Sequence, residues 1–380
     1  MDTRSMTGTT PVAAHEWPGR RRRPSGRRRS VRRSALVASA VLTVALVATA
    51  CSSSSSASAS GSGSGSASGT TITLYNGQHE QTTDALVAAF EKKTGITVKV
   101  RSDDEDVLAN QILTEGSASP ADVIYTENSP ALETLQEHGR LSRVDASTLA
   151  KVASNYNSPQ GKWVGVSARV SVMDYNTSSL TKAQLPTSVM QLADPKWKGK
   201  IGLAQGESDF FPIVVSIQRT YGTKAAAAWL TAVKNNAGSN LYPDNETLTN
   251  EINLGHVELG VINHYYWYRE RAEVGAASMH SAIATFAPRD AGYIIDVSGA
   301  GIINTSTHKA ADQEFLAFLV SRQGQEILAH SDSFEYPLGS GVVTAQPLQP
   351  FDTLQPAPLT IAELGDGSSA TALLQQANLE

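Results

Sequence analysis

The chain of 380 residues has one cysteine, Cys51, and only 6% aromatic residues. A single cysteine cannot form a disulfide within the chain, so stability must come from a hydrophobic core. No G-x-S-x-G motif is present, which removes a common signature of serine hydrolases. The Gly-rich stretch at 61–69 lacks a flanking strand and helix, so it does not indicate a nucleotide-binding loop.

Basic residues are scarce beyond the N-terminus. Ten of the 31 Lys and Arg and two of the 36 Asp and Glu lie in residues 1–33, which leaves a net charge of −13 on the rest of the chain. A surface this acidic argues against nucleic acid as a partner and favours cations.

The N-terminus has the pattern of an export signal. Residues 1–33 are rich in arginine, and Ser34–Ala50 is uncharged and largely apolar. This combination predicts a signal peptide over residues 1–50, and its apolar part is at the short limit for a membrane span. The pair Arg32 and Arg33 keeps twin-arginine export open beside the general pathway.

Cys51 directly follows the small residues Ala-Thr-Ala and precedes a serine tract, where no core exists to bury a thiol. The pattern resembles a bacterial lipoprotein signal, which implies that Cys51 becomes the lipidated first residue. Residues 51–70 are nearly all Ser, Gly and Ala, a composition typical of a flexible tether. We therefore expect an exported protein that is lipid-anchored to the outer face of the bacterial cytoplasmic membrane.

The remaining residues, about 310, exceed one ordinary core and predict two domains. Strand-like and helix-like segments alternate along them, which indicates α/β layering with largely parallel strands. The expected strands are 71–75, 96–100, 122–125, 200–204 and 258–263. The expected helices are 81–93, 107–113, 211–220, 224–234, 248–254, 311–320 and 324–330.

Polar side chains follow several of the expected strands. In open α/β sheets, ligands bind beyond the carboxyl ends of the strands, so residues at these ends are candidates for a common site. The candidates are His79 after the first strand, Glu127 after 122–125, Glu207, Ser208 and Asp209 after 200–204, and Tyr265 and Tyr266 after 258–263.

Each candidate also has a simpler explanation. His79 fits a surface turn, Glu127 fits a helix cap, and the tyrosines fit an aromatic core. Their common position favours a shared site that offers phenolates, a carboxylate and an imidazole but no sulfur, a set that suits a hard cation. A phenol has a pKa of about 10, and a trivalent ion such as Fe(III) can displace its proton.

Three segments add a resemblance to a known family. YNGQHE (75–80), DVIYTE (122–127) and NHYYW (263–267) resemble signature segments of the periplasmic ferric-ion-binding proteins, the substrate-binding components of ATP-driven iron importers. The likeness continues in KWKGKIG (196–202), VSGAGI (297–302) and EYPL (335–338). The resemblance implies four iron ligands, namely His79, Glu127, Tyr265 and Tyr266.

In this family a synergistic anion, such as phosphate or carbonate, completes the coordination. Asn245 and Asn263 match polar positions that hold it, and Asn128 stands where some members have glutamine. Arg169 matches an arginine near the cleft, although a structural ion pair would explain it equally well.

The loop of Glu207, Ser208 and Asp209 departs from the family, which often has small neutral residues there. Two carboxylates beside a phosphate would repel it. We therefore expect weak use of phosphate, with a carboxylate of this loop, a water or a small anion such as carbonate in its place.

The resemblance implies an α/β, two-lobed periplasmic-binding-protein fold with an interdomain cleft and two β-strand crossovers, near 170–175 and 293–297. The first lobe would comprise 71–171 and about 296–346, and the second 172–295 and about 347–380. Iron would bridge the lobes and favour a closed state, which an ABC-type membrane permease would recognise. We expect a monomer.

Two other functions stay open at this point. The same fold could bind an organic anion or a phosphonate, although the acidic cleft argues against this. A surface metalloenzyme is the second alternative, but non-haem iron oxygenases tend to use two histidines and one carboxylate. A phenolate-rich ligand set suits sequestration better, so we expect a binding protein and no enzyme.

Overall fold

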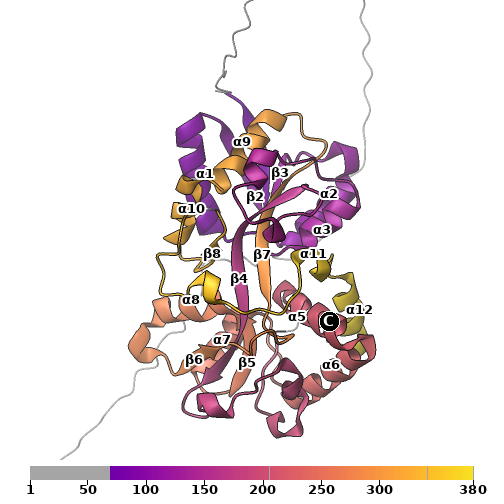
Figure 1. Ribbon diagram of the computed structural model, residues 1–380, viewed down its shortest axis with the longest axis vertical. Helices are drawn as coiled ribbons and strands as arrows, with labels where there is room; N and C mark the ends of the chain where they lie inside the picture. The colour runs from indigo at the N-terminus through magenta and orange to yellow at the C-terminus, as the bar shows by residue number, and fades with distance from the viewer. Residues whose placement is uncertain (1–68, 205, 340, 380) are drawn as a thin grey trace, which may run out of the picture. The chain divides into compact units, whose positions relative to one another are not determined.

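Helices and strands alternate along most of the described chain (Figure 1). The computed structural model describes residues 69–204, 206–339 and 341–379. The predicted signal peptide, Cys51 and the tether up to residue 68 lie outside these residues. No helix in the described ranges is long and apolar enough to cross a membrane.

Six strands follow one another across the main sheet in the order β2-β1-β3-β7-β4-β5. β1 (Thr71–Asn76) pairs in parallel with β2 (Thr97–Ser102) and with β3 (Val123–Thr126), whereas β3 pairs antiparallel with β7 (Ile295–Ile302). β7 is also antiparallel to β4 (Trp163–Asn176). The expectation of largely parallel strands is therefore wrong, because the chain passes along β4 and returns along β7.

All fourteen residues of β4 are buried. Its first half pairs with β7, and its second half pairs with β5 (Leu259–Asn263) and β6 (Ser281–Ala284). β8 (Tyr336–Pro337) pairs with its middle, at Ser167 and Ala168. β4 and β7 are the two long strands that join the upper and lower groups of elements in Figure 1, as expected for a two-lobed fold with two strand crossovers.

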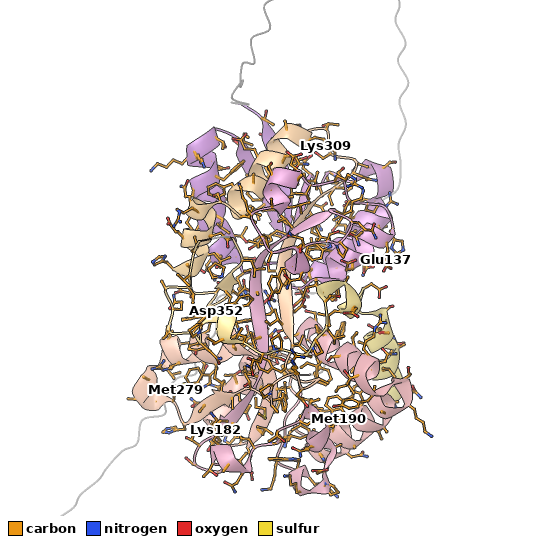
Figure 2. All side chains as sticks on the ribbon, in the orientation of Figure 1. Glu137, Lys182, Met190, Met279, Lys309 and Asp352 are labelled. Atoms are coloured by element: carbon orange, nitrogen blue, oxygen red, sulfur yellow. The ribbon has the colours of Figure 1, made fainter. Side chains whose placement is uncertain are left out.

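Helices cover the strands of both groups, and side chains fill the space around β4 and β7 (Figure 2). α1 (Glu80–Thr94) buries Leu86 and Phe90 at helical spacing and ends at Gly95, whose φ of 74° suits glycine. The other helices of the first group are α2 (Glu105–Glu115), α3 (Pro130–Glu137), α4 (Ala146–Leu149), α9 (Lys309–Leu319) and α10 (Arg322–Ala329). The second group comprises α5 (Phe211–Tyr221), α6 (Thr223–Ala237), α7 (Asn245–Asn253), α8 (His264–Val274), α11 (Ile361–Leu364) and α12 (Ser368–Ala377).

Several segments differ from the sequence expectation. Residues 200–204 form no strand but only isolated bridges, from Ile201 to Leu259 and from Leu203 to Leu241. Because the segment meets a different neighbour at each of these residues, neither contact extends into a ladder. The sequence analysis also does not predict α8, which begins directly after β5, or α3, α4, α11 and α12.

Candidate metal centre

The four predicted ligands all lie where a helix begins. His79 is the residue before the first turn of α1, and Glu127 lies between β3 and the start of α3. Tyr265 and Tyr266 are in the first turn of α8. The N-terminus of a helix carries a partial positive charge, so these positions favour the anionic forms of carboxylates and phenols.

The unexpected helix α8 explains how two neighbouring tyrosines can face one space. Adjacent residues of a strand point to opposite faces, but adjacent residues of a helix project about 100° apart. β5 ends at Asn263 and α8 begins at His264, so both tyrosines follow the helical geometry. Their rings are buried, with centroids 4.2 Å apart.

The side chains of the predicted ligands meet one another at short range. The Tyr265 hydroxyl donates a hydrogen bond of 2.6 Å to Oε1 of Glu127 and lies 3.2 Å from Oδ2 of Asp209. The Tyr266 hydroxyl donates to the same Oδ2 at 2.8 Å. Nε2 of His79 lies 3.5 Å from Oε1 of Glu127. Contacts of 2.6–3.5 Å therefore link two phenols, two carboxylates and one imidazole to one another.

The imidazole of His79 is available as a ligand. Burial lowers its pKa to about 4, so the ring is neutral at physiological pH. Its Nε2 is buried and has no hydrogen-bond partner among the described residues. A buried polar atom without a partner is costly, and coordination of a metal ion would satisfy it.

Three acidic groups of the site, Tyr265, Tyr266 and Asp209, hold their protons more strongly than usual. Burial, followed by the charges of Asp209 and Glu127, raises the pKa of Tyr265 and of Tyr266 well above 10. Burial and then Glu127 also raise the pKa of the Asp209 carboxyl. A trivalent cation at this point would reverse these shifts, because it favours every deprotonated ligand.

The loop expected to depart from the family pattern places one carboxylate in the site. Asp209 lies in a short 3₁₀ turn before α5, and its Oδ2 also accepts a hydrogen bond of 3.2 Å from Nδ2 of Asn245. Ser208 accepts a bond of 3.0 Å from Nδ2 of Asn128. Glu207 precedes the turn, and burial together with Asp209 raises its pKa to about 9.

The remaining predicted residues lie close to these groups. Asn128 receives a hydrogen bond of 3.1 Å from Nη1 of Arg169, and its own backbone N–H donates to Glu105 at 2.7 Å. Nη1 of Arg169 is also 3.2 Å from Oε1 of Glu127. Asn263 is buried at the N-terminus of α8, beside a narrow gap that Asn128 and Asp209 also line. The structure thus brings all predicted site residues of the described chain into one region.

Glu335 belongs to the same region, and sequence reasoning missed it. One of its carboxylate oxygens lies within 4.8 Å of ligand atoms of His79 and Glu127. The carboxylate forms an ion pair with Arg169 and accepts hydrogen bonds from Ser167 and Gln78. The segment EYPL contains Glu335, but nothing in the sequence connects it with an arginine 166 residues earlier.

His264 was also missed, although it stands beside Tyr265 in the segment NHYYW. Its Nδ1 accepts a hydrogen bond of 3.2 Å from the backbone N–H of Val170, and its Nε2 donates one of 2.8 Å to the carbonyl of Phe334. The ring stacks on Tyr336 with centroids 5.0 Å apart. His264 therefore fixes the start of α8 against β4 and the segment before β8.

Comparison with known proteins gives consistent similarities. Residues 118–361 match the family model described as bacterial extracellular solute-binding protein. The chain is 38% identical to the Fe(3+)-binding periplasmic protein of Serratia marcescens over 308 residues, which cover 81% of this chain and 90% of that protein. It is 36% identical to the major ferric iron-binding protein of Neisseria meningitidis over 311 residues, covering 81% and 93% of the two chains.

A solved structure shows the same similarity in three dimensions. Iron-bound HitA from Pseudomonas aeruginosa superimposes with a TM-score of 0.77 at 38% sequence identity. The match covers 82% of this chain and all of that one.

Proposed function

The chain belongs to the bacterial extracellular solute-binding protein family, and we propose that it captures ferric iron outside the cytoplasm and delivers it to an ABC-type membrane permease. Relatives at 36–38% identity that are named for ferric iron binding support this proposal. In the chain itself, one observation supports ferric-iron capture most directly. Two buried phenols contact two carboxylates beside an imidazole whose Nε2 has no hydrogen-bond partner among the described residues. This oxygen-rich set without sulfur suits a hard trivalent cation.

Five side chains are assigned as ligands in this proposal. The four that the family resemblance implies are His79, Glu127, Tyr265 and Tyr266. Asp209 is the fifth, because its Oδ2 lies within 3.2 Å of both tyrosine hydroxyls. A carboxylate of the protein at this position would take the role of an exogenous anion, and a water or a small anion such as carbonate would fill any position left open.

The proposed ligands come from both expected lobes. His79 and Glu127 belong to the lobe of residues 71–171, and Asp209, Tyr265 and Tyr266 belong to the lobe of residues 172–295. Only a closed arrangement allows all five to reach one ion, so iron would favour closure. The permease would then distinguish the loaded, closed protein from the empty one.

Capture of an organic anion or a phosphonate fits the site less well. Such a ligand needs a cation that is free to receive it. Arg169 is a buried cation of this region, and its guanidinium is engaged by Glu335, Glu127 and Asn128. The carboxylates around it would repel a second anion.

The location completes the proposal. An exported protein lipidated at Cys51 and held by the tether of residues 51–70 would stay near its permease, which raises the effective concentration for delivery. Capture and delivery require one metal site and two conformations, so a monomer that catalyses no reaction is sufficient.

A ferric titration followed by visible absorbance tests the function. Loading purified protein from ferric nitrilotriacetate should produce a phenolate-to-iron charge-transfer band. Tyr265→Phe and Tyr266→Phe should each weaken both the band and iron retention. Tyr268→Phe is the matched control, because Tyr268 lies on the same helix but donates its hydroxyl to the carbonyl of Pro347 at 3.1 Å. If the two site variants behave like this control, the assignment is wrong.

A further inference from the structure

Arg169 places a full positive charge inside the proposed ferric site. Its side chain lies on β4 and is completely buried. Nη1 approaches Oε1 of Glu127 to 3.2 Å and Oδ1 of Asp209 to 3.9 Å. The guanidinium carbon is 5.4 Å from the centre of the Tyr265 ring. A cation so close to three assigned ligands opposes the binding of another cation.

Glu335 supplies the opposite charge at the same depth. Its carboxylate is buried and forms an ion pair with Nη2 of Arg169. Ser167 donates a hydrogen bond of 2.6 Å to this carboxylate, and Gln78 donates one of 3.2 Å. Both oxygens of the Glu335 carboxylate are therefore engaged by protein donors, one by Arg169 and the other by Ser167 and Gln78.

The backbone before Glu335 is held in an unusual conformation. Phe334 has a φ of 54°, in the left-handed region that a bulky residue rarely adopts. Its carbonyl accepts the hydrogen bond from His264, the residue next to Tyr265. A strained residue persists only where its surroundings fix it, and such strain concentrates at functional sites. The hydrogen bond from His264 therefore fixes the segment before Glu335 to the start of α8.

We propose that Glu335 is a positioning and specificity-determining residue, whose pairing with Arg169 cancels the buried positive charge and so preserves the preference of the site for trivalent over divalent iron. The inference rests on the proposed function. Without Glu335, the charge of Arg169 would act fully on the metal and would penalise Fe(III) more than Fe(II). Without Arg169, the charge of Glu335 would do the reverse.

The reduction potential of the bound iron tests this inference, measured by spectroelectrochemical titration of the charge-transfer band. Glu335→Gln should raise the potential and Arg169→Gln should lower it. The double variant, which exchanges an ion pair for two amides, should return close to wild type. Outer-shell changes cost about 10–100-fold in metal affinity, and a tenfold change in the Fe(III)-to-Fe(II) affinity ratio corresponds to about 59 mV for one electron.

Shifts of opposite sign in the reduction potential distinguish an effect of charge from damage to the fold. If Glu335 had a purely structural role, the potentials of all three variants would shift in one direction, and the double variant would shift most. Potential shifts of the same sign in Glu335→Gln and Arg169→Gln, or no shift in either variant, would overturn the inference. Where Arg169→Gln does not fold, Glu335→Asp replaces it as the comparison. This variant keeps the charge, so it should leave the potential near wild type while Glu335→Gln shifts it, and equal shifts would again overturn the inference.

A second readout needs no redox change. Glu335→Gln should weaken binding of Ga³⁺ by a larger factor than binding of Zn²⁺, because the uncancelled charge acts on three positive charges instead of two. An equal loss for both ions would contradict the inference. Wild-type protein that fails to bind ferric iron would instead remove the proposed function, so the two failures are distinct.

Discussion

The hydroxyl of Tyr265 donates a hydrogen bond of 2.6 Å to Glu127, which lies 138 residues earlier in the chain. A proton thus joins two groups that the proposed function assigns to one ferric ion. Tyr266 makes the equivalent bond to Asp209 at 2.8 Å. These two hydrogen bonds connect four of the five assigned ligands in pairs.

Ferric loading should therefore release both phenolic protons. Burial and the nearby carboxylates raise the pKa of Tyr265 and of Tyr266, so both are protonated in the empty protein at physiological pH. Binding must displace these protons, so affinity should rise with pH and fall on acidification, by about tenfold per proton and pH unit. Titration in weakly buffered solution measures the release, and Tyr266→Phe should release one proton fewer. Equal release from the variant and the wild type would contradict the assignment.

Asp209 should make the site independent of added anions. Asp209→Asn keeps the size of the side chain but removes its charge, so ferric affinity should fall by about 10–100-fold or more. Phosphate or carbonate should restore part of the loss in the variant and have little effect on the wild type. Affinity measured by competition with citrate would show this. The control is Glu207→Gln in the same loop, which should lose less, and a wild type that requires phosphate would disprove the prediction.

Asp174 should lower the stability of the fold as the pH rises. Both of its carboxylate oxygens are buried without a hydrogen-bond partner among the described residues, and burial raises its pKa well above the usual range. Its ionisation is therefore easier in the unfolded chain, whose Asp pKa is about 3.9. The folded state retains the proton above that pH, so the stability contributed by this group decreases as the pH rises toward the folded pKa.

Asp174→Asn removes this pH dependence. At pH 7 the variant should be more stable by on the order of 1 kcal/mol, or about 1.5 °C in Tm for a folded part of this size. The gain should shrink toward pH 4. Thermal unfolding at several pH values measures it, with exposed Asp84→Asn as the control. A variant that is equally unstable at every pH would show that the carboxyl group is needed for another reason.

Cys51→Ser tests the lipid anchor, which lies outside the described residues. The variant should leave the membrane fraction and appear in the soluble exported fraction, because the acyl chains would be missing. Its ferric affinity should equal that of the wild type, since the site lies in another part of the chain. Ser52→Ala should remain membrane-bound. Membrane retention of the Cys51 variant would indicate a different means of attachment.

The positions of the candidate ligands could be predicted because they depend on local signals. A strand is recognisable from its β-branched residues, and the polar residues after it must lie at the edge of the sheet. This reasoning placed His79, Glu127 and the tyrosines near one another. The segment 200–204 was wrongly expected to be a strand, but Asp209 after it still reaches the site through the 3₁₀ turn.

The features that could not be predicted depend on contacts between distant segments. α8 has a weak apolar pattern, because its first turn faces the site and not a purely hydrophobic core. The ion pair of Arg169 and Glu335 joins residues far apart in sequence, and only the tertiary fold reveals it. The antiparallel strands follow from the return of the chain along β7, which no local pattern encodes.

The position of the ion pair beside β4 matters for repeated binding and release of iron. Arg169 lies on this strand, and Glu335 directly precedes β8, which is hydrogen-bonded to the same strand at Ser167 and Ala168. The two opposite charges therefore lie on β4 and directly before its paired strand β8. When the lobes part, Asp209 would move away from Arg169, whereas Glu127 and Glu335 belong to the same expected lobe as Arg169 and would stay beside it. After iron release, the charge of Arg169 would still be balanced by Glu335. Each new round of iron binding would therefore start from the same neutral ion pair.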